Sequence, residues 1–146
     1  MPPHKVIIID DGSSVNQDWR GRFEESGWTV RTFRESNYLL SIIAKEGPDL
    51  LILGMSNLWL DEKDFVRKLR DWLHRIRHID RFSTLPIILI SGRRLSSDSV
   101  LDLSFLGVEK IIPLPISTPE LMAEVRSIVD ISGEDSYYES KKFKRC

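Results

Sequence analysis

The sequence predicts an α/β fold with a doubly wound parallel sheet, and three observations predict it. Apolar runs of strand length alternate with segments of helical period along the 146 residues. The runs are rich in branched apolar residues, a pattern typical of strands that are buried on both faces of a parallel sheet. The residues that directly follow several runs are acidic, hydroxyl-bearing or glycine, and such sheets place their functional crevice at the carboxyl ends of the strands.

The first strand is expected at residues 6–9, a β-branched run that ends at Asp10 and Asp11. The helix after it has apolar residues at i, i+4 and i+8, and it is expected to end near Gly27, because glycine is common just after a helix. These apolar residues are Val15, Trp19 and Phe23. Residues 28–33 are expected to form the second strand, with partial alternation of apolar and polar side chains.

The second helix is expected to be short and to close at residues 47–48, a Gly-Pro pair. Its apolar residues are Leu39, Ile42 and Ile43. The third strand is expected at residues 50–53, before an irregular stretch at residues 54–60. Trp59 lies in that stretch and could cover a site at the end of the strand.

A long helix is expected at residues 61–79, with apolar residues at spacings of 4, 3, 4 and 3. These residues are Phe65, Leu69, Trp72, Ile76 and Ile79. An ordinary helix that packs this stripe on the sheet explains the pattern. A helix whose additional turns project past the sheet explains it as well, and Trp72, Ile76 or Ile79 would then form a docking or dimer surface.

The fourth strand is expected at residues 87–90 and the fifth at residues 110–112. The helix between them carries the apolar residues Val100, Leu101 and Phe105. A last helix is expected to open at residues 117–120, where a capping serine, a proline near the first position and an acid in the first turn follow one another. From about residue 132 the sequence loses its periodicity.

Five strands that alternate with five helices predict the flavodoxin-like doubly wound fold, with strand order 2-1-3-4-5 and helices on both faces of the sheet. One domain is expected at residues 1–131, followed by a polar, basic tail at residues 132–146. The tail is most simply a solvated end, and an electrostatic contact with nucleic acid or an acidic partner is the alternative.

The composition excludes several classes of protein. Apolar residues make up 41% and charged residues 29% of the chain, as in ordinary globular proteins. A formal net charge of −1 gives no general reason to expect a nucleic-acid or membrane partner. Cys146 is the only cysteine, so an intramolecular disulfide is excluded, and a cytoplasmic location is expected. The first apolar run is too short for a signal peptide or a membrane span.

Four segments keep a recognisable order and spacing, and they are residues 8–11, 48–53, 86–92 and 107–115. Together they resemble the receiver domain of two-component response regulators, of the chemotaxis-regulator type, over about residues 4–130. The resemblance implies that Asp10 and Asp11 correspond to the acidic pair that binds a divalent cation together with an acceptor aspartate. It implies that Ser91 is at the position of the switch hydroxyl, and that the Leu114–Pro115 bond is cis.

Three positions depart from the receiver pattern. The acceptor aspartate falls on Gly54, the invariant lysine on Leu114, and the switch aromatic on Ile111. Phosphoryl transfer needs a carboxylate nucleophile and a metal ion that neutralises the phosphoryl oxygens. Gly54 removes the nucleophile and one metal ligand, so Mg²⁺ is expected to bind weakly at Asp10 and Asp11 or not at all, and no other cofactor is expected.

Each retained polar residue also has a structural explanation. Asp10 and Asp11 either keep residual metal binding or cap the next helix and bond loop amides. Ser91 is either a switch hydroxyl or a turn residue. Asp61 could replace the missing acceptor, but capping of the long helix is the simpler role.

The leading hypothesis is therefore a pseudo-receiver, a phosphorylation-independent protein-interaction module in signal transduction that is not an enzyme. Its partner would be a histidine kinase or a downstream effector, and a homodimer is a further arrangement to test. The alternative is a divergent phosphorelay receiver with a displaced acceptor, Asp10 or Asp11. A third hypothesis is a flavodoxin-like small-ligand or nucleotide-binding domain, in which residues 12–14 offer amides and hydroxyls to a phosphate.

Overall fold

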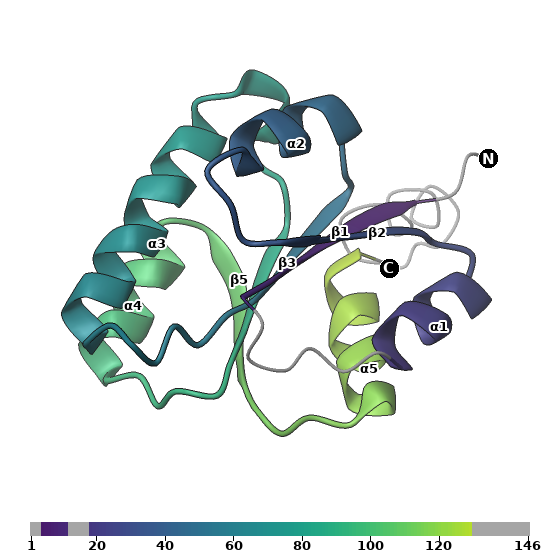
Figure 1. Ribbon diagram of the computed structural model, residues 1–146. Coiled ribbons are helices and arrows are strands. Elements are labelled where there is room, and N and C mark those ends of the chain that lie inside the picture. The colour runs from purple at the N-terminus through teal and green to yellow at the C-terminus, as the bar shows by residue number, and fades with distance from the viewer. Residues whose placement is uncertain (1–3, 12–17, 130–146) are drawn as a thin grey trace, which may run out of the picture. The chain divides into compact units, whose positions relative to one another are not determined.

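A computed structural model describes residues 4–11 and 18–129 of the chain. Its centre is a parallel five-stranded sheet with the order β2-β1-β3-β4-β5 (Figure 1). The strands are β1 (Lys5–Asp10), β2 (Thr29–Arg34), β3 (Leu50–Gly54), β4 (Ile87–Ser91) and β5 (Val108–Pro113). The predicted flavodoxin-like class and strand order are confirmed.

The chain divides into two compact units, residues 1–115 and residues 116–146. The first unit holds the sheet together with α1 (Asp18–Glu25), α2 (Leu39–Glu46), α3 (Glu62–Arg77), the short 3₁₀ helix η1 (Asp80–Phe82) and α4 (Ser97–Phe105). The predicted domain of residues 1–131 stays a prediction. The tail at residues 132–146 and the loop at residues 12–14 lie outside the described residues.

The second unit contains α5 (Thr118–Val129). Its start is a capping box, in which the amide of Glu120 donates to Oγ of Ser117 at 3.2 Å. In return the amide of Ser117 donates to Oε1 of Glu120 at 3.0 Å. These two bonds satisfy amides that the helix cannot pair internally, as the sequence of residues 117–120 predicts.

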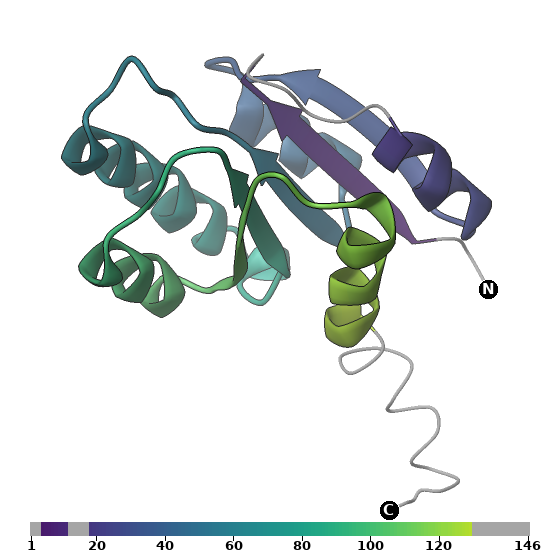
Figure 2. The same cartoon turned by 90° about the horizontal axis from the view of Figure 1, so that it is seen from below.

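Helices cover both faces of the sheet within the first unit. Side chains such as Ile7 and Leu51 belong to one buried cluster with apolar residues of α2, α3 and α4. Figures 1 and 2 show α1 on the opposite face. Every residue of β3 and of β4 is buried, which explains why both strands are continuous apolar runs without alternation.

The helix α3 corresponds to the long helix predicted at residues 61–79, and it spans 16 residues. Asp61 caps it, because its carboxylate accepts a hydrogen bond from the amide of Asp64 at 2.8 Å. Acidic residues in the first turn and basic residues in the last turn favour the helix dipole. Asp61 is therefore a capping residue, the simpler of its two predicted roles.

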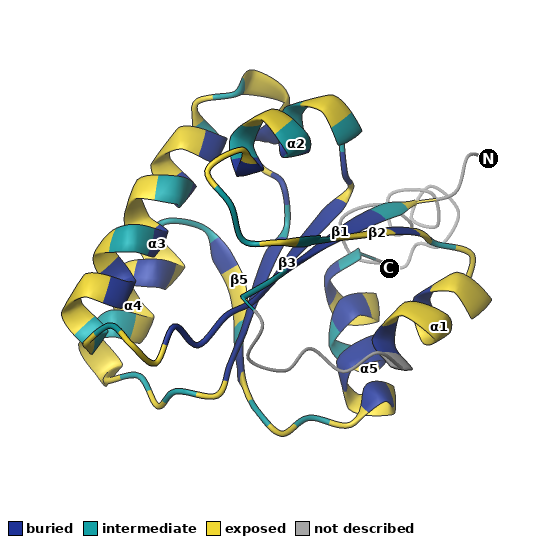
Figure 3. Ribbon diagram, in the orientation of Figure 1, coloured by how far each residue is buried: buried dark blue, intermediate teal, exposed yellow. Residues whose placement is uncertain are grey.

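The alternative prediction, a docking or dimer surface on this helix, is wrong for Ile76. Its side chain is buried in the core and only 1% exposed. Trp72 and Ile79 are partly buried and pack against the same core, and Ile79 lies beyond the end of the helix. The buried stripe also includes Val66 and Leu73. Figure 3 shows that the outward side of α3 is mostly exposed, so the 4-3 spacing marks an ordinary core face.

Arg77 ties the end of α3 to the segments before β4 and before β5. Its guanidinium donates to the backbone carbonyls of Phe82 at 2.9 Å, Leu85 at 2.8 Å and Gly107 at 2.9 Å. One side chain thereby satisfies backbone carbonyl groups in two separate segments, between α3 and β4 and between α4 and β5. Among the described residues, no helix has the length and apolar character of a membrane span.

Candidate functional site

The parallel sheet brings the predicted acidic pair next to the predicted acceptor position. Asp10 ends β1 and is paired in register with Gly54, the last residue of β3. The amide of Asp11 donates to the carbonyl oxygen of Gly54 at 3.3 Å. Because glycine has no side chain, the place where an acceptor carboxylate would project from β3 has backbone only. Asp61, the acid that the sequence offered as a replacement, caps α3 instead.

The carboxylate of Asp11 holds the loop that follows β3. Its Oδ2 accepts hydrogen bonds from the backbone amide of Ser56 at 2.8 Å and from the backbone amide of Asn57 at 2.9 Å. It also accepts one from the side-chain Nδ2 of Asn57 at 2.8 Å. The sequence left two roles open for Asp11, which were residual metal binding and the bonding of loop amides. These three contacts are of the second kind.

Asn57 is the centre of this arrangement. It is fully buried, and its φ of 42° lies in the left-handed region, which asparagine adopts more readily than most residues. Besides its contact with Asp11, Nδ2 donates to Oε1 of Glu35 at 3.2 Å. The amide oxygen Oδ1 accepts a hydrogen bond from Nζ of Lys68 at 3.0 Å. The side-chain amide therefore bonds one cation and two carboxylates.

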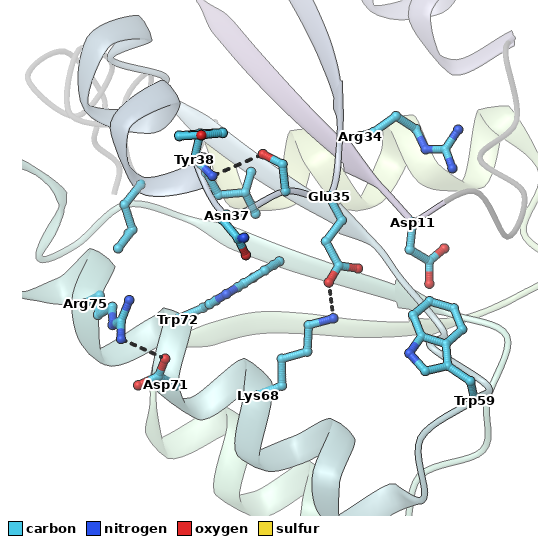
Figure 4. A pocket seen from close by; sticks show the side chains of 13 residues that line it. Asp11, Arg34, Glu35, Asn37, Tyr38, Trp59, Lys68, Asp71, Trp72 and Arg75 are labelled. Atoms are coloured by element: carbon cyan, nitrogen blue, oxygen red, sulfur yellow. Dashed lines mark hydrogen bonds and ion pairs between the residues drawn. The ribbon is translucent and has the colours of Figure 1, made fainter.

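Lys68 and Glu35 close the arrangement with an ion pair between Nζ and Oε2. We call Asp11, Glu35, Asn57 and Lys68 the Asn57 network. Its members come from the end of β1, the loop after β2, the loop after β3 and the helix α3. Figure 4 shows Lys68 reaching up from α3 toward Glu35. Four segments that are distant in sequence are thus held together at the carboxyl edge of the sheet.

A pocket of about 830 Å³ adjoins the network. Three of its lining residues are aromatic, namely Tyr38, Trp59 and Trp72 (Figure 4). The ammonium of Lys68 lies 5.9 Å from the ring centroid of Trp59 and 5.5 Å from that of Trp72, within the range of cation–π attraction. Trp59 is 67% exposed, so it borders the site as a rim residue.

Ser91, at the predicted switch position, bonds locally. Its Oγ accepts a hydrogen bond from the amide of Arg93 at 3.0 Å and lies 3.4 Å from the carbonyl oxygen of the same residue. These contacts are those of a turn residue. The neighbouring Gly92 donates its amide to Oγ of Ser56 at 2.8 Å, which links the loops after β3 and β4.

The other predicted positions lie along β5 and just after it. Leu114 is half-buried, and its amide donates to the carbonyl oxygen of Ser91 at 3.0 Å. An apolar side chain thus stands where the receiver pattern has a cation. Ile111 is partly buried and packs against the core. The peptide bond between Leu114 and Pro115 is cis, the isomer that the resemblance implies.

The donor set at this edge does not fit a Mg²⁺ ion, which requires tight octahedral coordination by oxygen atoms. Gly54 supplies no side-chain ligand, and Oδ2 of Asp11 already accepts three N–H groups. Glu35, the additional carboxylate nearby, is paired with the ammonium of Lys68. Within residues 4–11 and 18–129, no group of three or more His, Cys, Asp or Glu side chains is arranged to hold a metal ion.

Glu35, Asn57 and Lys68 were not predicted as site residues from the sequence. Lys68 belongs to a helix with many charged residues. The apolar periodicity of this helix shows which side is buried, but it does not identify the partner of a lysine at the margin of that side. A signal was present at Asn57, an asparagine in a short irregular stretch, because asparagine is frequent where the backbone is left-handed.

Solved structures identify the fold. The chemotaxis response regulator CheY4 of Vibrio cholerae superposes with a TM-score of 0.68 at 16% identity, over 86% of this chain and 98% of that one. A two-component response regulator from Clostridium difficile gives a TM-score of 0.66 at 21% identity, over 89% and 98% of the two chains. This is a receiver fold.

Sequence comparison also finds response regulators among the similar proteins. The response regulator MprA of Mycolicibacterium vanbaalenii is 25% identical over 127 residues, which are 87% of this chain and 51% of MprA. MprA of Mycobacterium leprae is 25% identical over 136 residues, 93% of this chain and 55% of that relative. The chain thus spans about half the length of the curated relatives that it matches. No protein-family model matches it.

Proposed function

We propose that this chain is a pseudo-receiver, a phosphorylation-independent protein-interaction module in two-component signalling. The observation that carries the proposal is the pairing of Asp10 with Gly54, beside an Asp11 carboxylate that is occupied by loop amides. Similarity to response regulators supports the signalling context. The partner would be a histidine kinase or a downstream effector, and a cytoplasmic location follows from that role.

The chemistry of phosphoryl transfer argues for the same conclusion. The reaction needs a carboxylate nucleophile in line with the phosphoryl donor, a divalent metal, and positive charge on the transferred oxygens. At the corresponding positions this chain has Gly54 and Leu114, and neither provides a nucleophile or a charge. At the same edge, the carboxylate of Asp11 is engaged in holding the loop after β3 through hydrogen bonds from Ser56 and Asn57.

The surface proposed for the partner is the exposed side of α4. Leu101 is 57% exposed and Phe105 is 83% exposed, and they lie four residues apart on the same side of the helix. Val100 beside them is 37% exposed. Aromatic and leucine side chains at this spacing are typical anchors for a helix-mediated protein contact.

The decisive experiment is a phosphotransfer assay. The intact chain is incubated with acetyl phosphate and Mg²⁺, and separately with a phosphorylated histidine kinase, and then analysed by intact-mass spectrometry beside a receiver that has an acceptor aspartate. No adduct of one phosphoryl group is expected on this chain. A second readout is an amide-resolved NMR titration with Mg²⁺ followed by beryllium fluoride, which is expected to leave the α4 and β5 signals unchanged.

A labile adduct would overturn the proposal in favour of a divergent phosphorelay receiver with a displaced acceptor. Asp10 is the specific residue to test, because it lies in register with Gly54 at the carboxyl edge. Loss of the adduct in Asp10→Asn or in Asp11→Asn would then identify the acceptor. Retention of a nucleotide or flavin by the purified protein would favour the third hypothesis, a small-ligand-binding domain.

A further inference from the structure

The carboxyl edge of the sheet contains a cation that belongs to the chain itself. Nζ of Lys68 forms an ion pair with Oε2 of Glu35 and donates to Oδ1 of Asn57 at 3.0 Å. The side chains of Lys68 and Glu35 are only 24% and 20% exposed. Two tryptophan rings lie within 6 Å of the same ammonium, at 5.9 and 5.5 Å. This lysine is therefore held in place by charge, by hydrogen bonding and by aromatic rings.

The surroundings require a positive charge at this point. The amide nitrogen of Asn57 donates to both Asp11 and Glu35, so two carboxylates converge on one buried side chain. Carboxylates that are close together and partly withdrawn from water repel each other unless a cation compensates them. Lys68 supplies that charge from α3, and Asn57 connects it to Asp11 through its own amide.

We infer that the ammonium of Lys68 is the resident cation of this site and takes the electrostatic role that a divalent metal has in a receiver. The inference rests on the proposed function and deepens it, because it explains how the site is kept insensitive to Mg²⁺. A metal ion that entered this cluster would compete with the ammonium of Lys68 for Glu35 and would be repelled by it, because the ammonium already bonds both Glu35 and the amide that links it to Asp11.

The experiment compares Lys68→Met with the wild-type chain, since methionine keeps most of the length of lysine and loses the charge. Mn²⁺ is added to ¹⁵N-labelled protein, and paramagnetic broadening is followed at the amides of Asp11 and Ser56. We expect no selective broadening in the wild type. In Lys68→Met we expect Mn²⁺ to bind at least tenfold more tightly, because Asp11 and Glu35 are left without their cation.

Two further variants separate charge from other effects. Lys63→Met removes an exposed lysine from the same helix and is expected to behave like the wild type. Lys68→Arg keeps the charge and is expected to remain insensitive to Mn²⁺. Equal Mn²⁺ affinity in the wild type and in Lys68→Met would overturn the inference, and so would tight binding to Lys68→Arg.

Glu35→Gln keeps the inference testable if Lys68→Met does not fold. This variant keeps the shape of the side chain but removes the charge that pairs with Lys68. Its unfolding temperature is expected to be lower and less dependent on salt than that of the wild type. An unchanged temperature with an unchanged salt dependence would show that the pair has no such role.

The failure of this inference can be told apart from the failure of the proposed function. A phosphoryl adduct on a wild-type chain that does not bind Mn²⁺ would contradict the pseudo-receiver and leave the role of Lys68 standing. Selective Mn²⁺ binding to a wild-type chain that forms no adduct would contradict the resident cation and leave the pseudo-receiver standing.

Discussion

The side-chain amide of Asn57 donates to the carboxylate of Asp11 at 2.8 Å, and the backbone amide of the same residue donates to the same oxygen at 2.9 Å. The carboxylate of Asp11 is thus a structural support for the loop after β3. Because Asp11 is partly buried, its carboxylate needs such hydrogen-bond partners, and the neighbouring Gly54 offers backbone only.

Replacing Asn57 is expected to destabilise the fold. Asn57→Ala removes three side-chain hydrogen bonds and places alanine at a φ of 42° in a fully buried position. The expected loss in the free energy of unfolding is about 2–4 kcal/mol, because buried charged partners lose their bonds. Urea denaturation followed by tryptophan fluorescence measures it.

Asn57→Gly is the matched control for the backbone. Glycine adopts a positive φ without strain, so this variant loses the hydrogen bonds but not the favourable conformation. Its loss is expected to be smaller than that of Asn57→Ala by about 1 kcal/mol. Losses below about 0.5 kcal/mol in both variants, the range of ordinary surface substitutions, would contradict the central place of Asn57.

The fold and the place of Asp10 beside Gly54 were predictable from sequence, but the Asn57 network was not. Buried parallel strands are continuous apolar runs, so residues 50–53 and 87–90 mark β3 and β4 with an error of one residue. The fifth strand, predicted at residues 110–112, extends over Val108–Pro113, because backbone pairing continues past the apolar residues. Apolar periodicity detects burial, and it therefore cannot show that Lys68 meets a glutamate from a distant loop.

Restoring the acceptor alone is expected to leave the chain inactive in phosphotransfer. In Gly54→Asp, the cation position still has Leu114, and Lys68 still pairs with Glu35. The new carboxylate would also enter a buried position at the end of β3, which lowers the free energy of unfolding. Intact-mass analysis after acetyl phosphate treatment checks the first expectation, and urea denaturation checks the second.

The double variant Gly54→Asp with Leu114→Lys shows whether the cation position is the remaining obstacle. A phosphoryl adduct on the single variant would mean that the site keeps its reactivity and lacks only the nucleophile. That result would contradict our view that several parts of the reaction machinery are absent. An adduct on the double variant alone would assign the obstacle to Leu114.

Acid is expected to weaken the contact between the starts of α3 and α4. Hydrogen bonds from Ser96 and from Ser99 lower the pKa of Glu62 to about 2, from an ordinary value of 4.5. A carboxylate whose pKa is depressed by folding stabilises the folded state above its unfolded pKa, and this contribution is lost as the pH falls through the folded pKa. The contribution of Glu62 is therefore complete above about pH 4.5 and lost between that pH and about 2.

Glu62→Gln tests this pH window, because glutamine cannot ionise. The difference in unfolding free energy between the wild type and Glu62→Gln is expected to be constant near neutral pH and to shrink on acidification below pH 4.5. Ser99→Ala removes one donor and is expected to move the window toward higher pH. A difference that does not depend on pH down to 2 would mean that the carboxylate is not stabilised by these serines.

Gly107 and Arg77 provide a test of how the end of α3 is fastened. Gly107 has a φ of +94°, and a Cβ added there would lie 2.6 Å from Nη2 of Arg77, whose guanidinium is fixed by several carbonyls. Gly27 has the same φ of +94° and no neighbour within 4 Å of such a Cβ. Both substitutions to alanine therefore carry a similar backbone strain of about 1–3 kcal/mol, and only Gly107→Ala also displaces Arg77.

We expect Gly107→Ala to cost more than Gly27→Ala by about 1–2 kcal/mol, the value of the hydrogen bonds that the displaced guanidinium gives up. In the background of Arg77→Met there is no guanidinium to displace, so the two alanine substitutions should then cost the same. Urea denaturation of the four single and double variants measures both differences. Equal costs in the wild-type background would show that Arg77 moves aside freely, and that its bonds to Phe82, Leu85 and Gly107 do not hold this end of the helix.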